Sequence, residues 1–105
     1  YLMLQHEVNT SEEPMMNILT YKTGEEWVVH VFPRKQHRPA QYFEGGEKQI
    51  LISPACIDMS GVLIMPREND FNNITANDIK DIYNQVGLDC EMVSNMISRL
   101  INQDI

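Results

Sequence analysis

Three fixed positive charges, Arg34, Lys35 and Arg38, lie within five residues, and two imidazoles, His30 and His37, accompany them. The chain of 105 residues has only eight Lys and Arg and a formal net charge of −7, so this segment concentrates positive potential. Guanidinium and ammonium groups bind phosphate through charge-assisted hydrogen bonds, and arginine can bind two oxygens at once. The pattern therefore predicts a site for a phosphate-bearing small ligand, with these five residues as candidate contacts.

Two interpretations of the basic segment are open from the sequence. The first is the phosphate site; the second is a solvated loop that keeps an acidic protein soluble or pairs with Glu44 and Glu47. No glycine-rich phosphate loop accompanies the basic residues, so the pattern does not decide between them. It does argue against nucleic acid as a partner, because a net-negative domain repels a long polyanion over the rest of its surface.

The sequence offers no recognisable catalytic machinery. His30 lies inside a strand-like run, where a histidine is more often a partly buried structural residue than a catalyst. His37 is expected nearer to solvent, but no neighbouring carboxylate in the sequence supports acid–base chemistry there. Ser-His-Asp order, a nucleophile elbow and Cys-x-x-Cys spacing are all missing. We therefore predict no catalytic residue, no metal site and no cofactor.

The basic segment follows the strongest strand pattern in the chain, residues 26–32 (Glu-Trp-Val-Val-His-Val-Phe). Residues 15–22 predict a preceding strand, and Thr23-Gly24 supplies the short turn of an antiparallel hairpin. Alternation along the second strand places its side chains on two faces. One face carries Trp27, Val29 and Val31, and the other carries Val28, His30 and Phe32.

Prolines then separate the basic segment from two more predicted strands. Pro33 and Pro39 bracket the segment and keep it out of the sheet, because proline cannot donate to a strand ladder. Residues 49–53 and 61–65 are apolar runs that predict a third and a fourth strand, each stopped by a proline.

After these runs the hydrophobic period becomes helical. Thr75 is a good N-cap, Ile79, Ile82 and Val86 follow at helical spacing, and Gly87 ends the pattern. A second helix is predicted from Asp89 onward, with one broad apolar stripe: Met92, Val93, Met96, Ile97, Leu100 and Ile101. Strands first and helices last predict an α+β fold, an antiparallel sheet of about four strands followed by two C-terminal helices packed on one face.

Length and composition indicate a single α+β domain over residues 15–105, with residues 1–14 as a connector or the end of a preceding helix. Hydrophobic residues make up 43% of the chain, but no apolar run approaches the ~20 residues that cross a bilayer, which argues against a membrane partner. Cys56 and Cys90 are expected to be two buried free thiols rather than a disulfide. Free thiols suit a reducing cytoplasm, the predicted location.

The hairpin strands are apolar on both faces, and two terminal helices can cover only one face of a sheet. The sequence therefore predicts that another part packs against the second face of the hairpin. This part is either a missing N-terminal lobe or a second copy of the chain in a homo-oligomer. We also expect the isolated chain to self-associate, since it would otherwise expose an apolar patch.

Four short segments and one further residue resemble the C-terminal half of certain nucleotide phosphorylases. The segments are Met16-Asn-Ile-Leu-Thr-Tyr21, Trp27-Val-Val-His-Val-Phe-Pro-Arg34, Ile52-Ser-Pro-Ala55 and Gly61-Val-Leu-Ile-Met-Pro-Arg-Glu68, and the further residue is Phe71. The group includes diadenosine tetraphosphate phosphorylase and the GDP-hexose phosphorylases, which belong with galactose-1-phosphate uridylyltransferase in the histidine-triad superfamily. The chain looks closest to an uncharacterised bacterial branch of this group.

The resemblance implies a two-lobed enzyme that breaks a nucleotide phosphoanhydride through a nucleotidyl-histidine intermediate. In that group the nucleophile lies in a His-x-His-x-His or His-x-His-x-Gln motif of the first lobe, and this chain has neither. The implied function is a C-terminal, non-nucleophilic lobe that shapes the substrate site and contacts phosphates of a nucleotide or sugar phosphate. The alternative is a stand-alone dimerising or ligand-binding module without catalysis.

Overall fold

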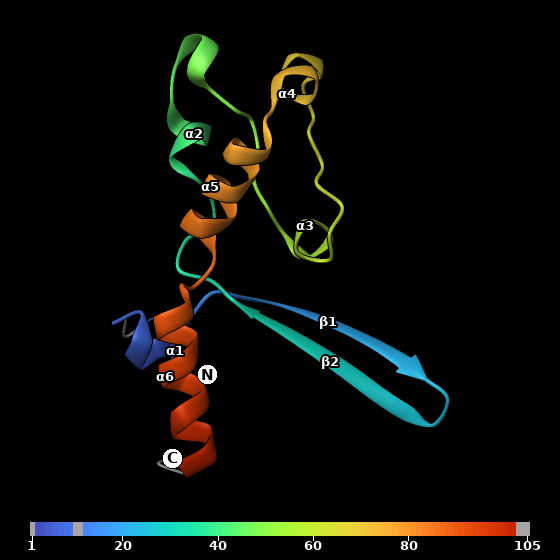
Figure 1. Ribbon diagram of the computed structural model, residues 1–105, viewed down its shortest axis with the longest axis vertical. Helices are drawn as coiled ribbons and strands as arrows, with labels where there is room; N and C mark the ends of the chain where they lie inside the picture. Colours follow the sequence, from blue (N-terminus) through green and yellow to red (C-terminus); the bar gives the residue numbers. More distant parts are fainter. Residues whose placement is uncertain (1, 10–11, 103–105) are drawn as a thin grey trace.

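The computed structural model describes residues 2–9 and 12–102 and has an α+β architecture (Figure 1). A single two-stranded antiparallel sheet is followed by a series of mostly short helices. The elements in chain order are α1 (Leu2–Glu7), β1 (Met16–Thr23), β2 (Glu26–Pro33), α2 (Ala40–Phe43), the 3-10 helix η1 (Gly46–Lys48), α3 (Cys56–Met59), α4 (Glu68–Asn73), α5 (Ala76–Val86) and α6 (Cys90–Asn102).

The predicted hairpin is confirmed as β1 and β2, paired from Met16↔Pro33 to Thr23↔Glu26. Gly24 begins the two-residue connection with a φ of +60°, a left-handed conformation that glycine adopts without steric cost. This register places Trp27, Val29 and Val31 on one face of the hairpin, as the alternation predicts.

The third and fourth strands predicted at 49–53 and 61–65 are wrong, because the structure has only two strands in the residues it describes. The first run is extended, yet its backbone groups bond to scattered partners: the Ile50 N–H to the Gln41 carbonyl and the Leu51 N–H to the Asp70 carboxylate. In the second run the Ile64 N–H donates to Asp58. An apolar run favours extended backbone, but a strand also requires a neighbouring strand.

Helix α5 lies where the sequence predicts it. The Thr75 hydroxyl accepts from the Asp78 N–H at 3.1 Å, and the Asp78 carboxylate accepts from the Thr75 N–H at 2.9 Å, which completes a capping box. Ile82 and Val86 are fully buried and, with Leu4 and Ile52, form the small apolar core.

Helix α6 also lies where the sequence predicts it, but it does not pair with α5 to cover one face of a sheet. Instead α6 packs against α1, while the helix in contact with β1 is the short α3. Ile97, Leu100 and Ile101 on α6 stay exposed. The predicted helix-on-sheet layer is therefore wrong in its arrangement.

The molecule is more open than a typical domain of its size. Its radius of gyration is 16.0 Å, against about 13 Å expected for a compact chain of this length. The hairpin projects away from the helices, with β1 on the side of α3 and β2 on the opposite side (Figure 1).

Both cysteines are free, as predicted, but Cys56 is only half-buried and Cys90 is exposed, so the expected burial is wrong. Within the described ranges, every helix is too short or too polar to cross a bilayer.

Candidate functional site

The first residue of the basic segment, Arg34, is buried, and its guanidinium bonds to the protein itself. Nη1 donates to Oδ1 of Asn17 at 3.0 Å and to the carbonyl oxygen of Pro54. Nη2 donates to the carbonyl oxygens of Gln36 at 3.2 Å and His37 at 2.8 Å. The side chain therefore ties β1, the basic loop (residues 34–39) and the segment before α3 together.

Burial lowers the pKa of Arg34 from its ordinary value, and the nearby Asp58 carboxyl and Cys56 thiol oppose that shift. The residue is only 3% exposed, and its Nε is a buried donor without a hydrogen-bond partner in the described residues. A guanidinium in this position orients the loop that follows it.

Farther along the basic loop, His37 and Arg38 reach an open cavity of about 810 Å³. Its lining residues are Gln36, His37, Arg38, Ala40, Phe43, Ser53 and Gln85. Thus His37 and Arg38, both exposed, share one cavity wall, and among the described residues neither pairs with Glu44 or Glu47 in an ion pair.

Two contacts orient the Arg38 side chain. Its Nε donates to the Ser53 hydroxyl at 3.3 Å, and the guanidinium carbon lies 4.3 Å from the centre of the Tyr42 ring. A cation–π contact of this kind restricts the guanidinium plane while leaving its edge available. In the described part of the chain, Nη1 and Nη2 of Arg38 have no hydrogen-bond partner, so both can donate to an anion in the cavity.

The other two candidates lie apart from this cavity. Lys35 is exposed at the end of the hairpin, where its N–H donates to the Val86 carbonyl at 3.0 Å. The His30 ring stacks between Tyr21 and Phe32 on the hairpin face that meets α3, beside a separate cavity of about 310 Å³. The structure therefore brings Arg38 and His37 together and separates His30 from them.

Sequence reasoning missed Ser53, Phe43 and Gln85. Ser53 could have been noticed from the sequence, because it is the polar residue between an apolar run and Pro54. A polar side chain at the end of an extended segment is a candidate for a ligand contact. Phe43 is 72% exposed, which no sequence pattern indicated. Gln85 comes from α5, where its Oε1 accepts from the Ala40 N–H at 2.7 Å, and only the tertiary fold reveals that contact.

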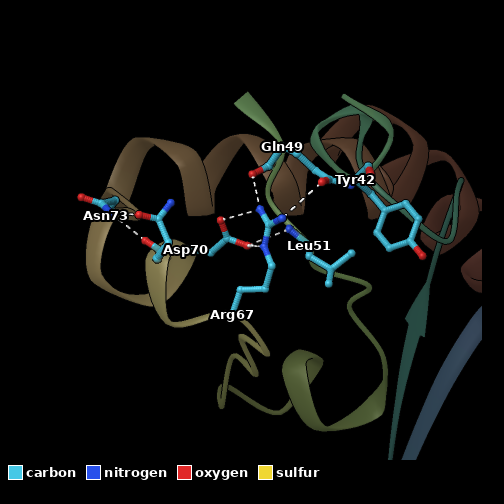
Figure 2. Close-up of polar contacts among 7 residues, drawn as sticks. Tyr42, Gln49, Leu51, Arg67, Asp70 and Asn73 are labelled. Atoms are coloured by element: carbon cyan, nitrogen blue, oxygen red, sulfur yellow. Dashed lines mark hydrogen bonds and ion pairs between the residues drawn. The ribbon is translucent and has the colours of Figure 1, made fainter. Parts of the chain in front are cut away.

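Two arginines hold the extended segment that carries Ser53 (Figure 2 shows the second). Arg34 bonds to its end at the Pro54 carbonyl. Arg67 bonds to its start, where Nη2 donates to the Gln49 carbonyl at 2.8 Å. Asp70, ion-paired to Arg67, accepts from the Leu51 N–H at 3.0 Å. Backbone that lacks a strand partner is thus satisfied by side chains.

Asp58 and Tyr83 hold the segment that follows Ser53 and Pro54 through further hydrogen bonds. The buried Asp58 carboxylate accepts from the N–H groups of Ala55 and Ile64 at 2.8 and 2.9 Å. The Tyr83 hydroxyl donates to the Asp58 carbonyl at 2.7 Å, which links α5 to α3. Burial raises the pKa of Tyr83 above its ordinary value, so the hydroxyl stays protonated and keeps donating.

The described residues thus form an α+β chain with an open cavity, which Arg38 and His37 line. The chain matches the family model described as "GDPGP1-like, C-terminal domain" over residues 7–104, and it belongs to that family. This match confirms the likeness to the C-terminal part of GDP-hexose phosphorylase-like proteins. Neither the search of curated proteins nor that of solved structures found a match.

Proposed function

We propose that this chain is the C-terminal, non-nucleophilic lobe of a phosphorylase-like protein, and that its basic loop contacts phosphate groups of a nucleotide or sugar phosphate. The family supports the first part, since the domain is named for its C-terminal position in GDPGP1-like proteins. The observation that carries the second part is Arg38, which lines the cavity and whose two terminal nitrogens have no hydrogen-bond partner among the described residues.

The five basic candidates have different roles in this proposal. Arg38 and His37 contact the phosphate directly, because both line the cavity. Arg34 is a positioning residue that holds the loop through the His37 carbonyl. Lys35 adds positive potential from outside the cavity wall, and His30 serves a separate part of the substrate surface on the hairpin.

Titration calorimetry with inorganic pyrophosphate tests the phosphate contact on the 105-residue chain. Each hydrogen bond to a charged group contributes about 1.5–3 kcal/mol, so Arg38→Ala should raise the Kd by at least about tenfold. Lys80→Ala is the matched control, since it removes one exposed positive charge from α5, away from the cavity, and should leave the Kd within about twofold. An equal Kd for Arg38→Ala and the unaltered chain, or no pyrophosphate binding at all, overturns the phosphate contact.

A second candidate function rests on a different observation. The hairpin exposes large apolar side chains on one face, which favours a stand-alone dimerising or ligand-binding module without catalysis. Pyrophosphate binding separates the two candidates, because a module whose basic loop is only surface has no reason to bind it through Arg38.

A further inference from the structure

The hairpin has two unpaired edges, and the register identifies the backbone groups that they present. The Arg34 N–H donates to the Met15 carbonyl at 2.9 Å, which makes that pair a hydrogen-bonded one. Hydrogen-bonded and non-hydrogen-bonded pairs alternate along an antiparallel ladder. The pair Thr20↔Val29, five steps along, is therefore non-hydrogen-bonded, and its N–H and C=O groups point outward.

The same alternation gives β2 three outward residues in its central part, Trp27, Val29 and Val31. Each places its backbone groups at the outer edge and its side chain on one face. The outer edge of β1 is partly occupied, because the Cys56 thiol lies 4.0 Å from the Ile18 carbonyl oxygen. On the outer side of β2, the described residues form one β-bridge, between Arg34 and Gly87. It lies after the end of β2 and leaves the edge of the strand itself unpaired.

The central part of the β2 edge also lacks the features that normally prevent strand addition. Native edge strands are short or carry lysine, proline or a bulge. β2 is eight residues long, has neither lysine nor an interior proline, and ends at Pro33. Trp27 is 67% exposed, Val29 56% and Val31 52%, so an apolar ladder follows the free edge.

We infer that a second copy of this chain pairs with this edge, β2 antiparallel to β2, to form a four-stranded sheet across a two-fold axis at Val29. This register sets Val29 opposite its own copy and Trp27 opposite Val31 of the other copy. Apolar residues then face apolar residues at all three outward positions, and no like charges meet. The neighbouring register, centred on His30, would instead set two imidazoles opposite each other.

The exposed area is large enough for a further contact of standard size. A compact monomer of 12.2 kDa is expected to expose roughly 6,100 Å². The chain exposes 7543 Å², an excess of about 1,400 Å². A stable interface of standard size buries about 800 Å² on each partner, so the excess is more than a dimer needs. The inference concerns a surface away from the Arg38 cavity and does not depend on phosphate binding.

Sedimentation equilibrium of the 105-residue chain and a matched proline pair tests this mode. Val29→Pro removes an outward N–H from β2 and no ladder bond within the hairpin, so it blocks strand addition at that edge. Thr20→Pro makes the same change on β1, directly opposite in the ladder. We expect a dimer for the unaltered chain and for Thr20→Pro, and a monomer for Val29→Pro. Matching circular dichroism spectra establish that both variants fold.

A monomeric unaltered chain overturns the inference, and so does a Val29→Pro variant that still dimerises. Loss of the dimer in Thr20→Pro with retention in Val29→Pro assigns the contact to β1 and also overturns it. The register has its own test. Hydrogen-bonded antiparallel partners lie about 5.5 Å apart at Cα, within disulfide range. With the free thiols Cys56 and Cys90 first replaced by serine, Val29→Cys should therefore form a cross-linked dimer on mild oxidation. Val31→Cys should not, and a cross-link there instead contradicts the register.

Arg38→Ala should remain dimeric, and Val29→Pro should still bind pyrophosphate. Failure of the dimer and failure of the phosphate site can therefore be told apart.

Discussion

Arg67 donates two hydrogen bonds to the Asp70 carboxylate, from Nε at 2.8 Å and from Nη2 at 3.0 Å (Figure 2). The side chain of Asp70 is almost completely buried, and it also accepts from the Leu51 N–H. A bidentate pair of this kind fixes direction as well as distance. It holds the extended segment that leads to the cavity wall at Ser53.

Replacing Asp70 by alanine should destabilise the fold. The change leaves the Leu51 N–H without its acceptor and the Arg67 guanidinium without its partner, at a cost of about 1–3 kcal/mol. Thermal unfolding followed by circular dichroism measures the effect as a lower Tm. Glu68→Ala is the control, because Glu68 is an exposed acid on the same helix, α4, and its loss should change the Tm little. Equal effects of the two substitutions would contradict the role given to Asp70.

The stability should also fall in acid. Hydrogen bonds from Arg67 lower the pKa of Asp70, and the Thr75 N–H lowers the pKa of Asp78. A carboxyl whose pKa is lower in the folded than in the unfolded chain stabilises the fold at any pH above its unfolded pKa of about 4. This stabilisation is lost as the pH falls from there through the lower pKa of the folded state. The Tm difference between the unaltered chain and Asp70→Asn should therefore be large at pH 7 and shrink below pH about 4. A difference that stays constant with pH would exclude linkage through Asp70.

Arg34→Lys should weaken the fold, and it should weaken the phosphate contact less than Arg38→Ala does. The guanidinium donates to four acceptors from two nitrogens, whereas an ammonium offers three donors at one point. We expect a loss of about 1–3 kcal/mol of unfolding free energy. The pyrophosphate Kd, measured well below the Tm, should rise less than the roughly tenfold expected for Arg38→Ala, because Arg34 acts only through the loop that it holds. A large rise in Kd with unchanged stability would instead place Arg34 in contact with the ligand.

The N-cap of α5 provides a local test of helix stability. Thr75→Ala removes the hydroxyl that accepts from the Asp78 N–H and should cost about 1 kcal/mol. Thr75→Ser keeps the acceptor and should retain most of the stability in the same urea titration. Comparable losses in both variants would show that packing of the threonine methyl, rather than the cap, stabilises this end.

Local patterns were sufficient where neighbours in sequence make the structure. The Thr75 cap, the α5 repeat ending at Gly87 and the hairpin across Gly24 all depend on contacts within a few residues, and the structure has each of them. The basic cluster was likewise visible from the sequence, as was the membership in a phosphorylase-like group that the family match confirms.

Only the tertiary structure decided the features that join residues far apart in the sequence. Residues 49–53 are extended, as their apolar content indicates, but their partners turned out to be Gln41, Arg67 and Asp70 rather than another strand. Arg34 and Arg38 look equivalent in sequence, yet acceptors from Asn17 and Pro54 bury the first, while Ser53 and Tyr42 hold the second at the cavity. Propensity is a local quantity, whereas strand pairing and the burial of a charge depend on which distant groups arrive beside it.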